Sequence, residues 1–384
     1  MNTLESQLDY AFGDTLPAPG QTVEVAPGVF WIRMALPFAL DHINLWLLRD
    51  EIDAGDGSGR KVPGWTVVDC CISSAETRAQ WERIFASMLD GLPILRVIVT
   101  HMHPDHIGLA HWLCERWQAP LWISATDYYV ARLFSQGASA NGGEAAAAFF
   151  SAHGLANPEV LQAIHGRNNY YANLVPDVPR QYHRMRDGDT LRIGSRVWQC
   201  ISGHGHAPEH IALYSEGPGT PLLLGGDMML PRISTNVSVY DTEPEGNALQ
   251  EFLDSIDKFA PLPRDTLTLP AHGKPFRGLH IRIQQLHNHH SEHLAHVLAA
   301  AQSAPCSAAD VLPVLFRRQL DVHQTTFAMG EAIAHLHKLW IDGDLQRVRD
   351  ADGVYRFRPT PQGLRQAGKA TPTASLSIAL PVQA

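Results

Sequence analysis

The segment Thr100-His101-Met102-His103-Pro104-Asp105-His106 decides the fold of this chain. It places three imidazoles and one carboxylate within six positions, directly after the apolar run Ile94 to Val99. That run is short, β-branched and bounded by a proline and the polar segment, which is typical of a buried strand. The first two histidines are expected on one side of the chain, and the proline turn brings the last two ligand-type residues to the same pocket. The segment therefore predicts a metal site on a rigid strand end rather than a histidine-rich surface turn.

Three later strand ends each supply another ligand-type residue. The strand-like run 197–201 leads into Gly203-His204-Gly205-His206, the run 222–224 leads into Gly225-Gly226-Asp227, and the run 267–269 leads into Pro270-Ala271-His272-Gly273. A glycine beside the histidine allows a sharp backbone turn that brings the imidazole close to a metal. Each of these signals is weak alone, but together with the first segment they indicate one metal centre.

The order and spacing of these residues resemble the metallo-β-lactamase superfamily, and within it the glyoxalase II-like hydrolases, which have an aspartate where some β-lactamases have cysteine. The similarity covers about residues 23–275, apart from an inserted segment. It implies an α+β fold, an αββα sandwich of two facing sheets with helices outside and a dinuclear site along one edge. The implied ligands are His101, His103 and His206 for the first metal, Asp105, His106 and His272 for the second, and Asp227 as the bridge between them.

This donor set predicts hydrolytic chemistry. Imidazole and carboxylate ligands without a thiolate suit two divalent ions, with Zn²⁺ favoured and Fe²⁺ or Mn²⁺ as alternatives. Two metals about 3.5–4 Å apart lower the pKa of a bridging water from about 15.7 to about 7, which makes hydroxide available near neutral pH. That hydroxide would attack a carbonyl or phosphoryl centre, and Asp105 would orient it and accept a proton. The sequence has no Gly-x-Ser-x-Gly nucleophile elbow.

Five further residues are candidates for contacts around the metals or the substrate. Asp69 follows a predicted strand and either orients a ligand histidine or caps the predicted helix 75–89. His42 either reaches the pocket or lies at the surface with its hydrogen-bonding groups satisfied, and the surface interpretation is preferred. The remaining candidates are His210, Tyr170 and Tyr171.

Composition narrows the class of protein. The 384 residues carry a net charge of −9, which argues against a chain that mainly coats nucleic acid or anionic membrane. The five cysteines form no CxxC pair, which is typical of reduced thiols in a cytoplasmic protein. No run approaches the roughly 18 apolar residues of a membrane span, and the N-terminus lacks a secretory signal pattern. We therefore expect a cytoplasmic protein without a membrane partner.

The chain is expected to divide into an N-terminal arm and two domains. Residues 1–22 form a loosely ordered arm, residues 23–276 form the catalytic domain, and residues 277–384 form a small helical, winged-helix-like domain. Within the catalytic domain, residues 126–187 interrupt the strand pattern and predict a helical insertion over the pocket mouth. A packing subdomain without substrate contact is the alternative for that insertion.

The C-terminal region predicts a winged helix from helices at 308–319 and 326–340 and a hairpin whose Asp-Gly turn lies at 350–353. Some relatives with such a module act on RNA. However, residues 301–370 hold nine Lys/Arg against seven Asp/Glu, a balance that favours a structural or dimerising role over phosphate contact. The arginines that could reach phosphate from one face of the hairpin are Arg347, Arg349, Arg356 and Arg358.

The preceding predicted helix, 279–301, is rich in histidine. The preferred interpretation of these residues is a polar helix face near the domain junction, and a second metal site is the alternative. The histidines are His287, His289, His290, His293 and His296.

The sequence therefore predicts a metal-dependent hydrolase that acts on a small-molecule carboxylic derivative, a thioester or a lactone. A phosphodiesterase or ribonuclease with the same dinuclear site is the first alternative. A non-catalytic winged-helix regulator that uses the sandwich as a metal sensor is the second. A β-lactam substrate and a nucleic-acid partner are both less favoured, and a homodimer is compatible with the pattern.

Overall fold

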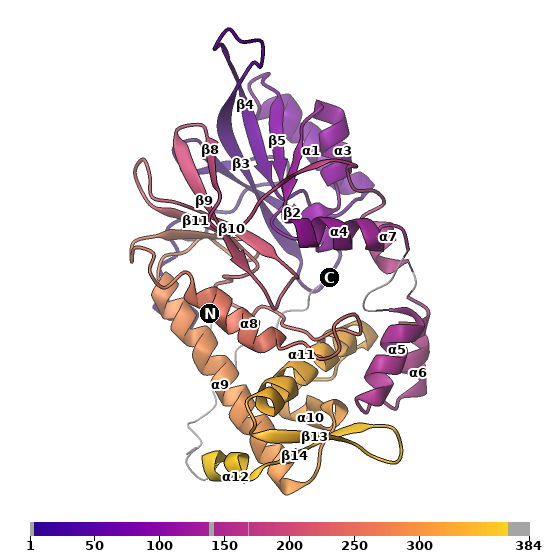
Figure 1. Ribbon diagram of the computed structural model, residues 1–384. Helices are drawn as coiled ribbons and strands as arrows, with labels where there is room; N and C mark the ends of the chain where they lie inside the picture. The colour runs from indigo at the N-terminus through magenta and orange to yellow at the C-terminus, as the bar shows by residue number, and fades with distance from the viewer. Residues whose placement is uncertain (1–3, 138–141, 168, 368–384) are drawn as a thin grey trace.

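Two β-sheets lie face to face, and helices cover the outer side of each sheet (Figure 1). The computed structural model describes residues 4–137, 142–167 and 169–367. One sheet has seven strands and the other has five, and a separate two-stranded hairpin lies in the C-terminal region. The predicted αββα sandwich is therefore confirmed.

The first sheet begins as an antiparallel meander and ends as a parallel sheet. Its strands, in spatial order, are β1 (Val23–Ala26), β2 (Val29–Ala35), β3 (His42–Asp53), β4 (Lys61–Val68), β5 (Ile94–Ile98), β6 (Leu121–Ile123) and β7 (Tyr182–Arg184). The parallel pairs from β4 to β7 need crossover helices, which are α1 (Ala75–Ser87), α3 (Ala110–Trp117) and α4 (Ala125–Phe134). The carboxyl ends of these strands meet at one edge, so the loop after β5 opens there.

The second sheet brings two more loops to a common edge. Its strands, in spatial order, are β12 (Leu267–Pro270), β11 (Leu222–Gly226), β10 (His210–Ser215), β9 (Arg196–Gly203) and β8 (Thr190–Ile193). β11 and β12 are parallel neighbours, so Asp227 and His272, which follow them, leave the sheet side by side. The outer face is covered by α8 (Ala248–Asp257) and by α9 (Leu279–Ser303).

Large apolar side chains fill the space between the sheets. Trp31 and Trp46 of the first sheet stack with ring centroids 6.4 Å apart, and Trp198 of the second sheet belongs to the same buried cluster. Separate clusters join the first sheet to α1 and α3, and the second sheet to α8 and α9. Close packing on both faces of each sheet holds the loops at the shared edge in fixed positions.

The segment 126–187 was predicted to be a helical insertion over the site, but two of its helices pack elsewhere and its end belongs to the first sheet. It contains α5 (Gly143–Ala152), α6 (Pro158–His165) and α7 (Tyr170–Leu174), but it ends in β7, a strand of the first sheet. α5 and α6 pack against the C-terminal region, where the rings of His153 and Tyr355 lie 5.2 Å apart. α7 is the part that contacts the histidine-rich loop, because the Tyr171 hydroxyl donates to the carbonyl of Met102 at 2.5 Å.

The C-terminal region follows the predicted order of helices and hairpin. After α9 it consists of α10 (Ala308–Leu315), α11 (Val322–Ile341), β13 (Leu345–Arg349), β14 (Tyr355–Pro359) and α12 (Pro361–Ala367). Its core is continuous with that of the second sheet, since Met329 and Phe357 belong to one buried cluster with Phe252 of α8. The two parts therefore share a hydrophobic core.

The N-terminal arm is packed rather than loose from residue 4 onward. Leu8 is buried, the backbone of Asp9 pairs with that of Arg277, and Gln285 donates to the carbonyl of Leu4. Burial of the apolar Leu8 side chain at the start of α9 explains why the arm stays attached. Among the described residues, no helix combines the length and apolar character needed to cross a membrane. The five cysteines are buried and form no disulfide.

Candidate metal centre

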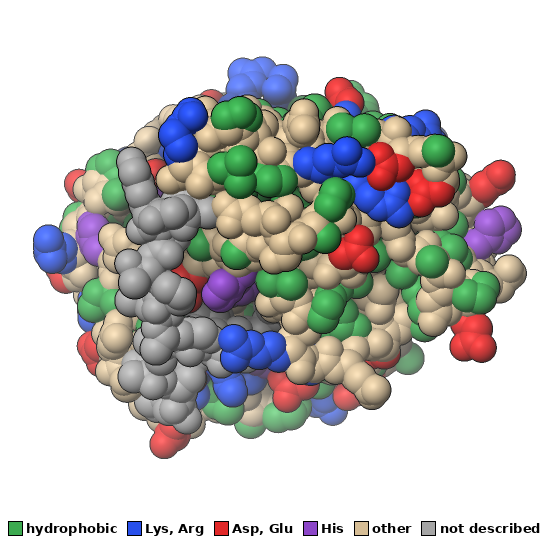
Figure 2. All heavy atoms as spheres, turned by 90° about the horizontal axis from the view of Figure 1, so that it is seen from below, with side chains coloured by type: hydrophobic (Ala, Val, Ile, Leu, Met, Phe, Trp, Pro, Cys, Tyr) green, Lys and Arg blue, Asp and Glu red, His purple; other side chains and the backbone are tan. Residues whose placement is uncertain are grey.

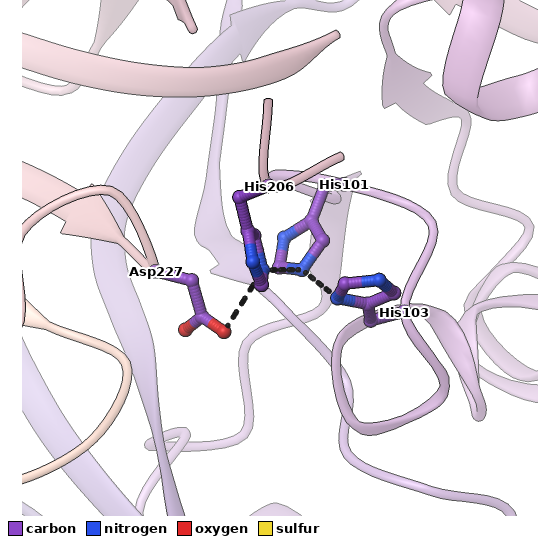
Figure 3. A group of neighbouring side chains, drawn as sticks. All are labelled: His101, His103, His206 and Asp227. Carbon is purple, nitrogen blue, oxygen red and sulfur yellow. Dashed lines mark hydrogen bonds and ion pairs between the residues drawn. The ribbon is translucent and has the colours of Figure 1, made fainter. Parts of the chain in front are cut away.

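Three imidazoles and one carboxylate converge at the edge shared by the two sheets (Figure 3). The Nε2 atom of His101 lies 2.9 Å from Nδ1 of His103 and 3.3 Å from Nε2 of His206. Nε2 of His206 lies 3.2 Å from Oδ2 of Asp227. These residues come from the loop after β5, the loop after β9 and the end of β11, so three separate chain segments build the first group.

A second group lies on the other side of the Asp227 carboxylate. Asp105 and His106 belong to the short helix α2 (Pro104–Ile107), and His272 follows β12. Nε2 of His272 lies 3.4 Å from Oδ2 of Asp105 and 3.4 Å from Oδ1 of Asp227. Nε2 of His106 lies 3.5 Å from the same Asp227 oxygen. Asp227 therefore faces both groups, one oxygen toward each.

In three of the candidate ligands, the imidazole Nδ1 donates a hydrogen bond to a neighbouring group. Nδ1 of His206 donates to the carbonyl of Asn236 at 2.8 Å, and Nδ1 of His272 donates to the carbonyl of His42 at 2.7 Å. Nδ1 of His106 donates to Oδ2 of Asp69 at 2.8 Å. A proton on Nδ1 leaves the lone pair of Nε2 directed into the site, as metal ligation requires.

The residues present fit a pair of divalent ions. Nε2 of both His106 and His272 is buried without a hydrogen-bond partner in the described part of the chain. Such atoms are costly to bury unless a cation or a proton satisfies them. The donors are imidazoles and carboxylates, the set that suits Zn²⁺, Fe²⁺ or Mn²⁺.

Charge and burial oppose each other within the site. Burial alone would lower the pKa of His106, but the carboxylates of Asp69, Asp105 and Asp227 outweigh it and raise that pKa well above its usual range. Burial lowers the pKa of His101 well below its usual range, and the neighbouring imidazoles add to the effect. The carboxylates therefore favour positive charge at this end of the site, which a bound divalent cation would supply.

Asp69 contacts a candidate ligand instead of capping a helix. Its carboxylate accepts the hydrogen bond from His106 and two more from Thr100, at the backbone nitrogen and at Oγ1. α1 is capped by Ser74, which accepts from the backbone nitrogen of Thr77. Of the two interpretations left open for Asp69, the cap is therefore wrong.

Replacing Asp69 by Asn is expected to weaken metal binding by about 10- to 100-fold, the usual cost of losing the group that orients a ligand. The side-chain amide can occupy the left-handed backbone position of this residue (φ 63°), but it has one acceptor oxygen and cannot accept from both His106 and the backbone nitrogen of Thr100. Competition with a chromophoric chelator measures the affinity. Asp53→Asn, at an exposed carboxylate, is the control. An unchanged affinity in a folded Asp69→Asn variant would leave Asp69 with a structural role alone.

His42 and His210 both hold the backbone of the site. The side chain of His42 is 14% exposed and its Nε2 accepts from the backbone nitrogen of Gly273 at 2.8 Å, so the surface interpretation is wrong. Nε2 of His210 accepts from the backbone nitrogen of Asp227 at 3.2 Å. A side chain at Gly226 would place its Cβ 2.2 Å from that nitrogen, which explains the glycine before Asp227.

The two candidate tyrosines lie on α7 beside the site. Tyr171 is tied to the carbonyl of Met102 and therefore holds the loop between His101 and His103. The Tyr170 hydroxyl is buried and has no hydrogen-bond partner among the described residues. Burial raises the pKa of Tyr170 to about 12, and the charge of Asp105 adds to the shift, so the hydroxyl remains a donor at neutral pH.

Two residues that support the site were missed in the sequence. Asp127 accepts from the backbone nitrogens of Met102 at 2.7 Å and Glu209 at 2.6 Å, and so joins the loops that carry His103 and His206. Its position three residues after Ser124 resembles an ordinary helix start, which hides the second role. Asn236 lies in a stretch without regular secondary structure, where no periodicity marks it.

Comparison with known proteins agrees with this geometry. Residues 63–272 match the family described as the metallo-beta-lactamase superfamily. The chain belongs to this superfamily. Residues 294–360 match the C-terminal domain described as metallo-beta-lactamase-like. Superfamily membership, together with the two groups of candidate ligands, supports a metallo-hydrolase.

Similar proteins span nearly the whole chain. A crystal structure of a beta-lactamase domain protein from Burkholderia ambifaria is 53% identical, with a TM-score of 0.86, and covers 94% of this chain and 100% of that one. A metallo-beta-lactamase family protein from Thermus thermophilus is 26% identical, with a TM-score of 0.67, and covers 88% of this chain and 100% of that one. The probable metallo-hydrolase YqjP of Bacillus subtilis is 22% identical and covers 85% of this chain and 97% of that protein.

Proposed function

We propose that this superfamily member is a dinuclear metal-dependent hydrolase of the glyoxalase II-like type, acting on a small thioester or lactone. The observation that carries the proposal is the position of Asp227, whose two oxygens face two separate groups of ligands. A carboxylate placed in this way can bridge two cations. The printed name of the Bacillus relative, a probable metallo-hydrolase, agrees with this class of activity.

The two groups of ligands would each hold one ion. His101, His103 and His206 would hold one ion, Asp105, His106 and His272 the other, and Asp227 both, with Zn²⁺ favoured. When bound, the ion pair supplies hydroxide, because it lowers the pKa of a shared water to about 7. Asp105 lies at the second group and would orient the shared water and accept the proton that it loses on forming hydroxide. Asp69, Asn236 and the His42 carbonyl keep the imidazole lone pairs aimed inward.

Replacing Tyr170 by Phe is expected to lower kcat/KM by roughly 2- to 10-fold, because one substrate hydrogen bond contributes about 0.5–1.5 kcal/mol. The proposed role is a contact to the acyl oxygen, since this buried hydroxyl has no partner among the described residues. Steady-state kinetics with the preferred substrate measures the loss. Tyr129→Phe, at an exposed ring on α4, should leave kcat/KM unchanged. Equal kinetics for the wild type and Tyr170→Phe would remove Tyr170 from the substrate site.

The C-terminal hairpin gives little support to a nucleic-acid substrate. Arg356 binds Asp350 and Asp352, Arg358 binds Asp350, and Arg347 binds Glu245. Figure 2 shows the molecule from below the view of Figure 1, the side on which β13, β14 and α12 lie, and Lys and Arg side chains are mixed with Asp and Glu on this face. Phosphate binding requires uncompensated positive charge, so these pairs favour a small molecule over RNA.

A substrate panel tests the proposal. Zn²⁺-loaded protein is mixed with acyl thioesters, lactones, a generic phosphodiester and single-stranded RNA, and each reaction is repeated with Asp105→Ala. We expect turnover of thioesters or lactones that falls sharply in the variant. Cleavage of the phosphodiester or RNA alone, lost in the same variant, would replace the proposal by a phosphodiesterase. Absence of turnover throughout the panel by fully metal-loaded protein would contradict the proposed substrate class.

A further inference from the structure

A second buried cluster of ligand-type side chains lies between α9 and α11, apart from the catalytic edge. His289 and His293 are one helical turn apart on α9, so they lie on the same face of the helix. Glu331 faces them from α11 and is 1% exposed. One ligand atom from each residue lies within 4.8 Å of the other two. Figure 1 shows the two helices crossing below the sandwich.

Each of the three residues also has a buried side-chain atom without a hydrogen bond in the described part of the chain. These atoms are Nε2 of His289, Nδ1 of His293 and Oε1 of Glu331. Each of them can act as a ligand through a lone pair. Unsatisfied buried polar atoms are uncommon in folded proteins. Three in one place indicate that something else satisfies them.

A divalent cation fits this arrangement. Two imidazoles and one carboxylate from two helices each offer a ligand atom within 4.8 Å of the others, and each has a buried atom that no hydrogen bond satisfies in the described part of the chain. One cation bound between them would satisfy all three side chains at once.

We propose that His289, His293 and Glu331 form an additional metal site for a borderline divalent cation such as Zn²⁺. Two imidazoles and a carboxylate match the ligand types of such ions, with a fourth position for water. His335 is not a further ligand, because its Nδ1 donates to the carbonyl of Glu331 at 2.8 Å and its Nε2 accepts from Nδ1 of His290 at 3.3 Å. A cavity of about 510 Å³ beside α9 is lined in part by His289 and Glu292, so one of the three proposed ligands borders it.

The site would fasten the C-terminal region to the catalytic edge. Oε2 of Glu331 accepts from Nδ2 of Asn236 at 3.3 Å, and the carbonyl of Asn236 accepts from Nδ1 of His206. One residue therefore joins the additional site to a candidate catalytic ligand. An ion held between α9 and α11 would stabilise this connection as well as the contact between the two helices.

Metal analysis of matched variants tests the proposal. Wild type, Glu331→Gln and His293→Ala are equilibrated with Zn²⁺, freed of excess ion, and measured by inductively coupled plasma mass spectrometry. We expect both variants to hold one Zn²⁺ per chain less than the wild type. Glu331→Gln keeps an oxygen for Asn236 and is expected to fold even if His293→Ala does not. His287→Ala removes an imidazole of α9 that is bonded to Asp257, and should keep the wild-type count.

Crystallography of the wild-type protein would locate the ion. Anomalous scattering at the zinc edge should give a peak between His289, His293 and Glu331, in addition to any peaks at the catalytic edge, and this peak should be absent in Glu331→Gln. Full occupancy at the catalytic edge with no peak between the helices would overturn the proposal. Folded Glu331→Gln protein with the wild-type zinc count would also overturn it. Both outcomes leave the proposed hydrolase untouched, so the two proposals fail separately.

Discussion

Replacing Asp227 by Ala is expected to lower hydrolytic turnover by more than about 100-fold. Loss of a group that merely orients a ligand costs roughly 10- to 100-fold, and Asp227 itself faces both groups of ligands. Without it, the imidazoles of His206 and His272 lose the one carboxylate that lies between them. Bound metal should fall below the wild-type count in the same variant, and turnover and metal content are measured on one preparation.

The Asp227→Ala result needs two comparisons. Asp254→Ala removes an exposed carboxylate of α8 that accepts a hydrogen bond from Gln250, and it should keep turnover and metal content. Asp227→Asn keeps the size of the side chain but removes its charge, so it should lose activity without disturbing the fold. A folded Asp227 variant with wild-type turnover would contradict the bridging role.

Replacing Asp50 by Ala is expected to reduce the free energy of unfolding by about 3–5 kcal/mol, the usual cost of removing one partner of a buried ion pair. The Asp50 carboxylate is fully buried on β3 and accepts two hydrogen bonds from Arg96 of β5, both at 2.8 Å. It also accepts from the backbone of Gly194, between β8 and β9. The change therefore loosens both sheets at once, and urea denaturation measures it.

An exposed pair provides the control for Asp50. Glu82 of α1 binds Arg116 of α3 with both side chains about half exposed, and such pairs contribute only about 0–1 kcal/mol. Glu82→Ala should accordingly shift the urea midpoint little. Equal shifts for Asp50→Ala and Glu82→Ala would contradict the role assigned to the buried network.

The candidate ligands could be found in the sequence because each follows a strand. A buried strand is marked by its short apolar run, and His101, Asp227 and His272 all come directly after such a run. Chain direction then brings the carboxyl ends of parallel neighbours to one edge. The residues from His101 to His106 lie within one loop and the short helix that follows it, so their side chains can reach the same pocket. At these positions the local sequence pattern and the sheet topology both indicate the ligands.

Other features depend on contacts that no local pattern encodes. Asn236 acts through its backbone carbonyl, which every residue has, so its identity carries no signal for the bond to His206. α5 and α6 were recognisable as helices, but their packing against the C-terminal region depends on side-chain fit such as that of His153 and Tyr355. β10 was not among the predicted strands, although it is buried along its whole length.

Anomalous diffraction from Zn²⁺-loaded crystals is the most direct test of whether two ions share Asp227 at the edge of the sandwich. We expect two peaks about 3.5–4 Å apart. One should be bound by His101, His103 and His206, the other by Asp105, His106 and His272, with an Asp227 oxygen on each. A single peak in fully loaded protein, or two peaks that Asp227 does not touch, would contradict this arrangement.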